Sequence, residues 1–183
     1  DIADKHLVWG EWSQEVATAI GVPLHKIHIT GAPMIGSTIA IQESKRRPNN
    51  RSARALFTLM PESPMTFGNG GALSLSECQG VMKMLFRWIE LMDGRVILQI
   101  KPRPLCDHPW FDSFRLNLPA HVKILPNDLS VGKALKNTDI VVTTHSTVAI
   151  DAISMQKPLV FLDWGYKPHP FIDAVRYGAA EIA

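Results

Sequence analysis

Cysteine is scarce in this chain, and its scarcity argues against two kinds of site. The 183 residues include two cysteines, Cys78 and Cys106, which lie far apart and have no Cys-x-x-Cys or histidine partner at ligand spacing. A disulfide framework is therefore excluded, and a metal site is not indicated. Reduced thiols and a cytoplasmic location are the simplest expectation. We expect no metal and no cofactor.

Long apolar runs are also missing. None approaches the roughly 20 residues that cross a bilayer, and Asp1, Asp4 and Lys5 interrupt the start, where a signal peptide would need an apolar segment. The chain opens on aspartate and stops at Ala183, within what reads as an αβ repeat. We therefore expect an excerpt of a larger protein.

A strong excess of one charge is absent too. The net charge is +2, and charged residues make up 20% of the chain, close to the average for globular proteins. This balance predicts no nucleic-acid partner. The basic residues do cluster locally, at Lys45, Arg46, Arg47, Arg51 and Arg54. Such a run is most often a solvated loop, and the alternative is a rim that attracts anionic substrates or allows peripheral association with an anionic membrane.

The first part of the chain reads as one strand–helix–strand repeat followed by a linker. A short apolar run at 7–9 predicts a strand, apolar residues at helical spacing from Trp12 to Ile20 predict a helix, and alternation at 26–30 predicts a second strand. Residues 34–52 are polar and basic without periodicity. We expect a linker there, between a unit at 1–33 and a domain at 53–183.

From residue 53 onward, apolar strands alternate with amphipathic helices. Strands are expected at 55–60, 95–100, 122–125, 139–144 and 158–163, and helices at 74–94, 129–136 and 148–155. This alternation predicts an α/β fold, a Rossmann-like parallel sheet flanked by helices and joined by right-handed crossovers. In such sheets ligands bind outside the carboxyl ends of the strands, which nominates 61–71, 101–104, 143–147 and 163–170.

The segment Thr143, Thr144, His145, Ser146 and Thr147 is the strongest of these candidates. A strand ends in hydroxyl residues and passes at once into a helix, whose first N–H groups and partial positive charge suit a phosphate. Plain capping, which stabilises a helix by roughly 1 kcal/mol, is the simpler alternative. One hydroxyl would be enough for capping, so the four hydroxyls and the histidine favour phosphate binding.

Two cations follow an earlier strand. Lys101 and Arg103 leave it in a proline-stiffened loop, where they could clamp a diphosphate and stabilise it as a leaving group; solvated loop charges are the alternative. The glycines at 68–71 are a weak signal, because neither a Gly-x-Gly-x-x-Gly nor a Walker motif is present. No catalytic residue can be named from these patterns.

The segments 139–151 and 156–161 resemble the C-terminal, donor-binding domain of GT-B-fold transferases. The nearest resemblance is to bacterial surface-carbohydrate and teichoic-acid-type polymerases (CDP-glycerol transferase-like), whose pattern there reads T-D-Y-S-S-x-x-x-D followed by G-K-P-V. The loop 101–104 is similar to their R-P-H-P loop, and 8–33 is similar to the last repeat of their N-terminal domain. The resemblance thus implies one half of a GT-B architecture, preceded by part of the other half.

The resemblance also implies which side chains bind the donor phosphates. Ser146, Thr147, Lys101 and Arg103 occupy the family's phosphate-binding positions, and Thr144 and His145 complete the candidate site. Thr144 stands where aspartate is usual and His145 where tyrosine is usual. The further departures are Arg103 for histidine and Gln156 for glycine.

The function implied is that of a glycosyltransferase in cell-surface polysaccharide biosynthesis. Its partners would be a nucleotide-activated sugar or polyol and a glycan or lipid-linked acceptor, at the inner face of the membrane. The isolated chain is expected to be inactive, because the family's acceptor site lies mostly on the N-terminal domain. Two alternatives stay open: a non-hydrolysing UDP-sugar 2-epimerase, which needs a Glu-Glu pair where this chain has only Asp151, and a non-enzymatic nucleotide- or glycan-binding module.

Overall fold

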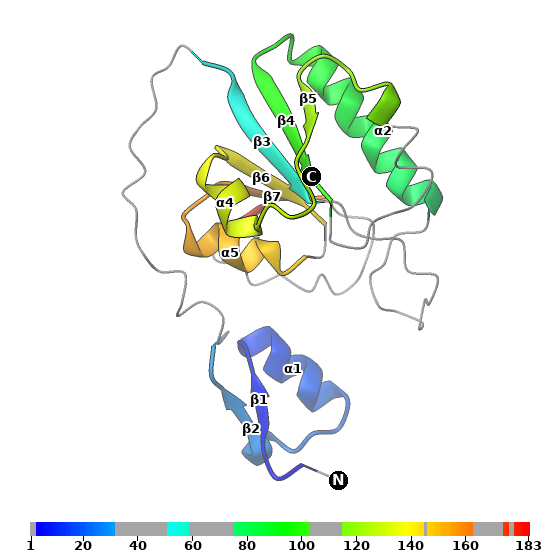
Figure 1. Ribbon diagram of the computed structural model, residues 1–183. Coiled ribbons are helices and arrows are strands. Elements are labelled where there is room, and N and C mark those ends of the chain that lie inside the picture. The colour runs from blue at the N-terminus through cyan, green and yellow to red at the C-terminus, as the bar shows by residue number, and fades with distance from the viewer. Residues whose placement is uncertain are drawn as a thin grey trace.

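The computed structural model describes residues 3–31, 51–58, 75–102, 115–144, 146–162, 174–175 and 178–183. It contains a two-stranded parallel sheet near the N-terminus and a six-stranded sheet formed by the rest of the chain (Figure 1). The expected linker falls largely on residues outside the described ranges.

The N-terminal unit is a single β–α–β repeat, as the sequence predicted. Its elements are β1 (His6–Val8), α1 (Glu11–Ala19), a 3₁₀ turn η1 (Leu24–Lys26) and β2 (Ile27–Ile29). The two strands pair in parallel. Within residues 3–31 only Ile27 is buried, while Leu7, Ile20 and Leu24 are largely exposed. Because a two-stranded sheet needs further packing to be stable, this unit has too small a core to fold by itself.

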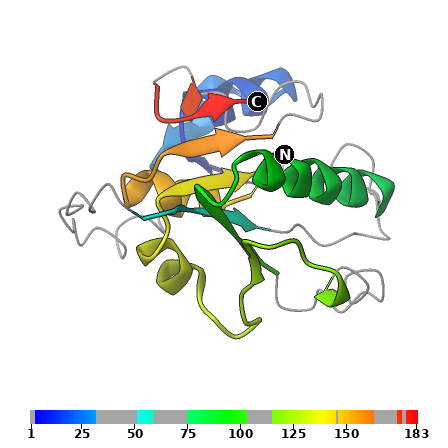
Figure 2. The ribbon, with the colours of Figure 1, turned by 90° about the horizontal axis from the view of Figure 1, so that it is seen from above.

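The second unit is a parallel sheet flanked by helices, which confirms the predicted fold class. Its strands are β3 (Ala53–Thr58), β4 (Val96–Lys101), β5 (Val122–Ile124), β6 (Ile140–Thr143), β7 (Leu159–Phe161) and β8 (Glu181–Ile182), and its helices are α2 (Leu75–Leu91), α4 (Val131–Lys136) and α5 (Val148–Ser154). Every strand pairing is parallel. The spatial order, β5-β4-β3-β6-β7-β8, can be followed strand by strand in Figure 2, and it is the order of a doubly wound Rossmann-like sheet.

Apolar side chains pack on both faces of this sheet. One face is covered by α2, which contributes Cys78, Val81, Met82, Leu85 and Ile89 at helical spacing. The other face is covered by the short helices α4 and α5 (Figure 1). Neighbouring residues of β3 point to opposite faces of the sheet. Because helices cover both faces, residues on either side of the strand are buried, which explains its uninterrupted apolar run.

The observed elements differ from the predicted ones mainly at their ends. The long helix stops at Leu91 rather than at Gly94, because Asp93 and Gly94 adopt positive φ angles of 45° and 74°. Residue 74, where this helix was expected to begin, lies outside the described residues. Strand β8 was not predicted, since it has two residues, both exposed, and no apolar run marks it.

The end of α5 provides a first testable prediction. Gln156 has φ of 51°, and the N–H groups of Gln156 and Lys157 donate to the carbonyls of Ile153 and Ala152, each at 2.9 Å. This is a Schellman motif, in which glycine is preferred because a Cβ is strained at positive φ. We expect Gln156→Gly to raise the free energy of unfolding by about 1 kcal/mol in urea denaturation. Gln156→Ala, which keeps the Cβ, should give no comparable gain.

Candidate functional site

The carboxyl ends of β3 and β6 meet at the point where the sheet changes its winding direction. These strands are neighbours, but the chain continues from β3 to α2 on one face and from β6 to α5 on the other. Open α/β sheets bind ligands in the crevice at such a switch point. The last residues of the two strands are Thr58 and Thr143, both buried, and their Oγ1 atoms lie 2.8 Å apart.

The turn after β6 contains most of the predicted site. The Thr144 side chain is 2% exposed, and its Oγ1 has no hydrogen-bond partner among the described residues. Ser146 is also buried; its N–H donates to the Thr144 carbonyl at 3.0 Å, and its Oγ accepts from the Val148 N–H at 3.3 Å. Ser146 therefore caps α5, whereas Thr147 is exposed and makes no side-chain capping bond. His145 lies outside the described residues.

Lys101 ends β4 but does not extend into solvent. Its side chain is 4% exposed, and Nζ donates to the carbonyls of Pro102 at 2.7 Å and Asn127 at 3.1 Å. Burial lowers the pKa of the ammonium group, and the nearby Asp128 carboxylate partly offsets that effect. Lys101 thus joins the end of β4 to the loop after β5, and one of its N–H donors has no partner among the described residues. Arg103, the second predicted cation, lies outside the described residues.

Asp151 is an acidic residue within the first turn of α5. It is partly buried, and burial raises the pKa of its carboxyl group above the usual 3.8. The folded protein therefore favours the protonated form of the Asp151 carboxyl group. The contribution of this group to the free energy of unfolding is fully present below pH 3.8 and is lost as the pH rises through the raised pKa. We expect Asp151→Asn to raise the melting temperature near pH 7 and to have little effect near pH 3, as thermal unfolding across that range would measure.

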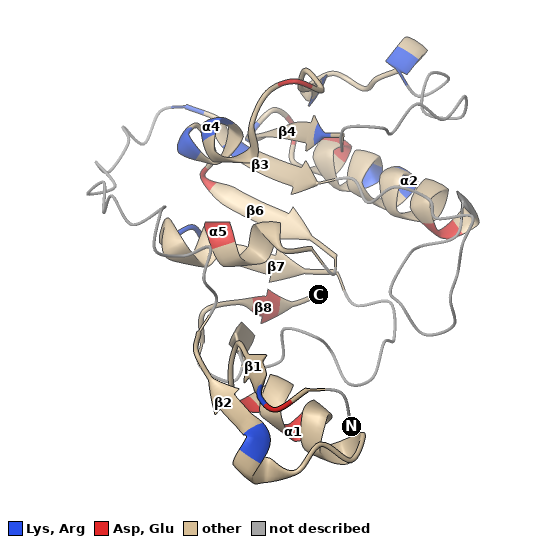
Figure 3. Cartoon of the chain, turned by 60° about the horizontal axis from the view of Figure 1, so that its bottom comes forward, with Lys and Arg blue, Asp and Glu red and all other residues tan. Residues whose placement is uncertain are grey.

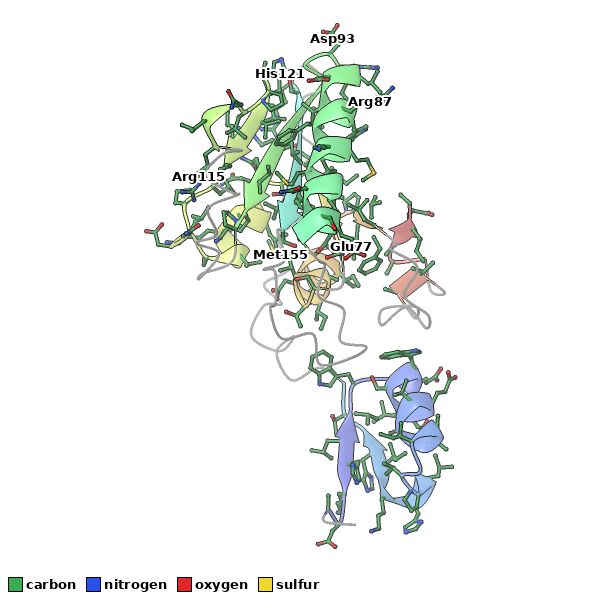
Figure 4. The ribbon with its side chains drawn as sticks, turned by 90° about the vertical axis from the view of Figure 1, so that its right-hand side faces the viewer. Glu77, Arg87, Asp93, Arg115, His121 and Met155 are labelled. Carbon is green, nitrogen blue, oxygen red and sulfur yellow. The ribbon has the colours of Figure 1, made fainter. Side chains whose placement is uncertain are left out.

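The helices and strands of the second unit differ in the charged residues that they carry. Figure 3 shows Lys and Arg on α2 and α4, while β6 and β7 carry no charged residue. Asp93 and His121 lie at one end of α2 and Glu77 at the other (Figure 4). Within the described ranges, no group of three or more His, Cys, Asp or Glu residues could hold a metal ion. No described helix is both long and apolar enough to span a membrane.

Thr58 belongs to the candidate site by its contact with Thr143, and it was not among the residues predicted from the sequence. The segment nominated after the strand that contains Thr58 begins at residue 61, because the apolar run predicts a strand that continues to Met60. The structure describes β3 over Ala53–Thr58, and residues 59 and 60 lie outside the described residues. The signal was present in the sequence: a hydroxyl residue in an otherwise apolar buried strand, near its carboxyl end.

Comparison with known proteins supports the fold. No protein-family model matches the sequence, and no curated protein matches it significantly. Among solved structures, the UDP-GlcNAc 2-epimerase of Methanocaldococcus jannaschii, in complex with UDP-GlcNAc and UDP, matches with a TM-score of 0.70 and 17% identity over 100% of this chain and 51% of its own.

Two further solved structures belong to the same group of folds. MnaA of S. aureus, solved with UDP, matches with a TM-score of 0.68 and 14% identity over 98% of this chain and 46% of its own. The glycosyltransferase SnogD of Streptomyces nogalater matches with a TM-score of 0.50 and 17% identity over 86% of this chain and 36% of its own. The chain therefore spans about half the length of the first two. These likenesses confirm a Rossmann-like fold of the GT-B type.

Proposed function

We propose that residues 53–183 form the donor-binding domain of a GT-B enzyme that uses a nucleotide-activated sugar or polyol. The observation that carries the proposal is the Thr144 hydroxyl, which is buried at the switch point without a partner among the described residues. A buried donor of this kind is destabilising unless a partner satisfies it. An oxygen of a donor phosphate would supply that partner.

The neighbouring groups suit the same ligand. Ser146 and Thr147 carry hydroxyl groups close to Thr144 in the chain. Helix α5 begins directly after them, and the start of a helix favours negative charge. Lys101 has one N–H donor without a partner among the described residues, in a buried setting where a charge acts more strongly than in water. In a transfer reaction these groups would stabilise the charge that develops on the departing diphosphate. With Arg103 and His145 they form the proposed phosphate site.

The specific reaction we favour is glycosyl or polyol-phosphate transfer of the teichoic-acid-polymerase type, in cell-surface polysaccharide biosynthesis. A glycan or lipid-linked acceptor and a site at the inner face of the cytoplasmic membrane belong to this proposal. Residues 3–31 would be the last repeat of a preceding domain. Their small core supports this, since only Ile27 is buried there. The acceptor would bind mostly on that preceding domain.

A UDP-sugar 2-epimerase is the second candidate, and the likeness to the M. jannaschii enzyme favours it. Epimerisation at carbon requires proton removal and return, for which an acid–base pair is needed. Helix α5 offers one carboxyl group, that of Asp151, instead of the adjacent pair. Incubation of a protein that also contains the preceding domain with UDP-GlcNAc in D₂O separates the candidates, because only an epimerase would incorporate deuterium at C2 of the sugar.

Ligand titration tests the shared part of both candidates. We expect the chain to bind UDP, CDP or GDP at least tenfold more tightly than the matching nucleoside, because the proposed contacts are to phosphate, and a tenfold ratio needs about 1.4 kcal/mol. Isothermal titration calorimetry with the three pairs would measure the ratio and also identify the preferred base. Equal affinities for diphosphates and nucleosides would contradict the phosphate site.

A further inference from the structure

Three polar residues form a row across the middle of the sheet at its carboxyl edge. The register of β3 with β4 sets Thr58 beside Lys101, and the register of β3 with β6 sets Thr58 beside Thr143, one step beyond the Phe57–Val142 pair. Leu56 and Val141, two residues earlier on β3 and β6, belong to the core beneath α4 and α5. Because side chains alternate along a strand, the row faces those two helices.

The two threonine hydroxyls leave one proton without an acceptor among the described residues. Thr58 is 5% exposed and Thr143 is 0% exposed, so both side chains are shielded from water. Their 2.8 Å contact uses one proton, since one hydroxyl donates and the other accepts. The accepting hydroxyl keeps its own proton, and the described residues offer it no acceptor. In a buried pair of this kind, the hydroxyl that accepts the first hydrogen bond can donate its own proton to a third group.

The contact is not needed to hold the two strands together. Backbone pairing of β3 with β6 already includes Ala55–Ile140, Leu56–Val141 and Phe57–Val142. Two apolar β-branched side chains of the same shape would fill the same space. Packing between the two strands therefore does not explain why both side chains carry hydroxyl groups.

We propose that Thr58 is a positioning residue that orients the Thr143 hydroxyl toward the ligand phosphate. Thr58 donates to Thr143 Oγ1, and Thr143 then donates to a phosphate oxygen held by the turn at 144–147. Thr143 is the member next to the turn along the chain, because β6 ends at Thr143 and the turn follows it directly. A hydrogen bond received by Thr143 polarises the one that it donates, so the two strengthen each other. This inference rests on the proposed function and extends the phosphate site to a second strand.

Substitution of each threonine by valine tests the relay, since valine keeps the shape and removes the hydroxyl. We expect Thr143→Val to weaken UDP binding about tenfold and Thr58→Val to weaken it several-fold, with uridine affinity unchanged in both. The double variant should be no weaker than Thr143→Val alone, because Thr58 acts through Thr143. Thr58→Ser, which restores the hydroxyl, should recover most of the affinity.

The outcomes separate the relay from the phosphate site itself. If wild-type protein prefers UDP over uridine and Thr58→Val keeps that preference in full, the relay is wrong and the phosphate site stands. If wild-type protein shows no such preference, both are wrong. Additive losses in the double variant would also overturn the relay, since they would mean independent contacts. Urea unfolding checks that each variant is folded, and Thr58→Ala replaces Thr58→Val if the valine variant does not fold.

Discussion

Replacing Phe57 by alanine is expected to lower the free energy of unfolding by about 3–5 kcal/mol, the largest single effect that we predict. Phe57 lies in the central strand β3, is 1% exposed and belongs to the core shared by the sheet and α2. Its removal would leave a cavity between elements that cannot close completely. It also precedes Thr58, so the carboxyl edge of β3 would shift with it.

Chemical denaturation monitored by circular dichroism measures this loss. Leu116→Ala is the matched control, because Leu116 is 83% exposed and its truncation should change stability by less than about 0.5 kcal/mol. A loss below about 1 kcal/mol for Phe57→Ala would contradict the packing described for this face of the sheet. Binding should be compared only under conditions in which the variant is fully folded.

Thr147→Ala is expected to weaken binding of a nucleoside diphosphate by about 1.5–3 kcal/mol, the usual range for a hydrogen bond to a charged group. Thr147 is exposed and makes no capping bond, so stability should be nearly unchanged. This separation of binding from stability makes Thr147 the cleanest probe of the turn.

Ser146→Ala provides the comparison. Because Ser146 Oγ accepts from the Val148 N–H, its loss should lower stability by about 1 kcal/mol even if no ligand binds there. The phosphate site adds a second effect, a loss of UDP affinity similar to that of Thr147→Ala. If UDP affinity is unchanged in both variants and only the stability of Ser146→Ala is lowered, the turn serves as a helix cap and the phosphate site is wrong.

The sequence predicted the layered fold well because its strands and helices have strong periodic signals. Helix α2 places five apolar residues on one face, and β3 is apolar throughout because both faces of the sheet are covered. Strand β8 carried no such signal, since it forms by pairing with β7 and buries neither of its residues. Pairing between distant segments is invisible to local periodicity.

The place of the candidate site in the fold followed from the sequence, but the contacts of its residues did not. The rule that ligands bind at the carboxyl ends of parallel strands led to the turn at 144–147 and to Lys101. Composition could not reveal that Lys101 is buried and bonded to two carbonyls, because that depends on where the loop after β5 lies. The Thr58–Thr143 contact was likewise hidden, since it joins residues 85 positions apart.

A crystal structure of the chain with bound UDP is the most direct test of the central claim, that the carboxyl edge between β3 and β6 holds the diphosphate of a nucleotide-activated donor. Phosphate oxygens are expected within about 3 Å of the Thr143 hydroxyl or of polar groups in the turn at 144–147. Density for UDP at the opposite edge of the sheet, near His121, or at the N-terminal unit with this turn left empty, would contradict it.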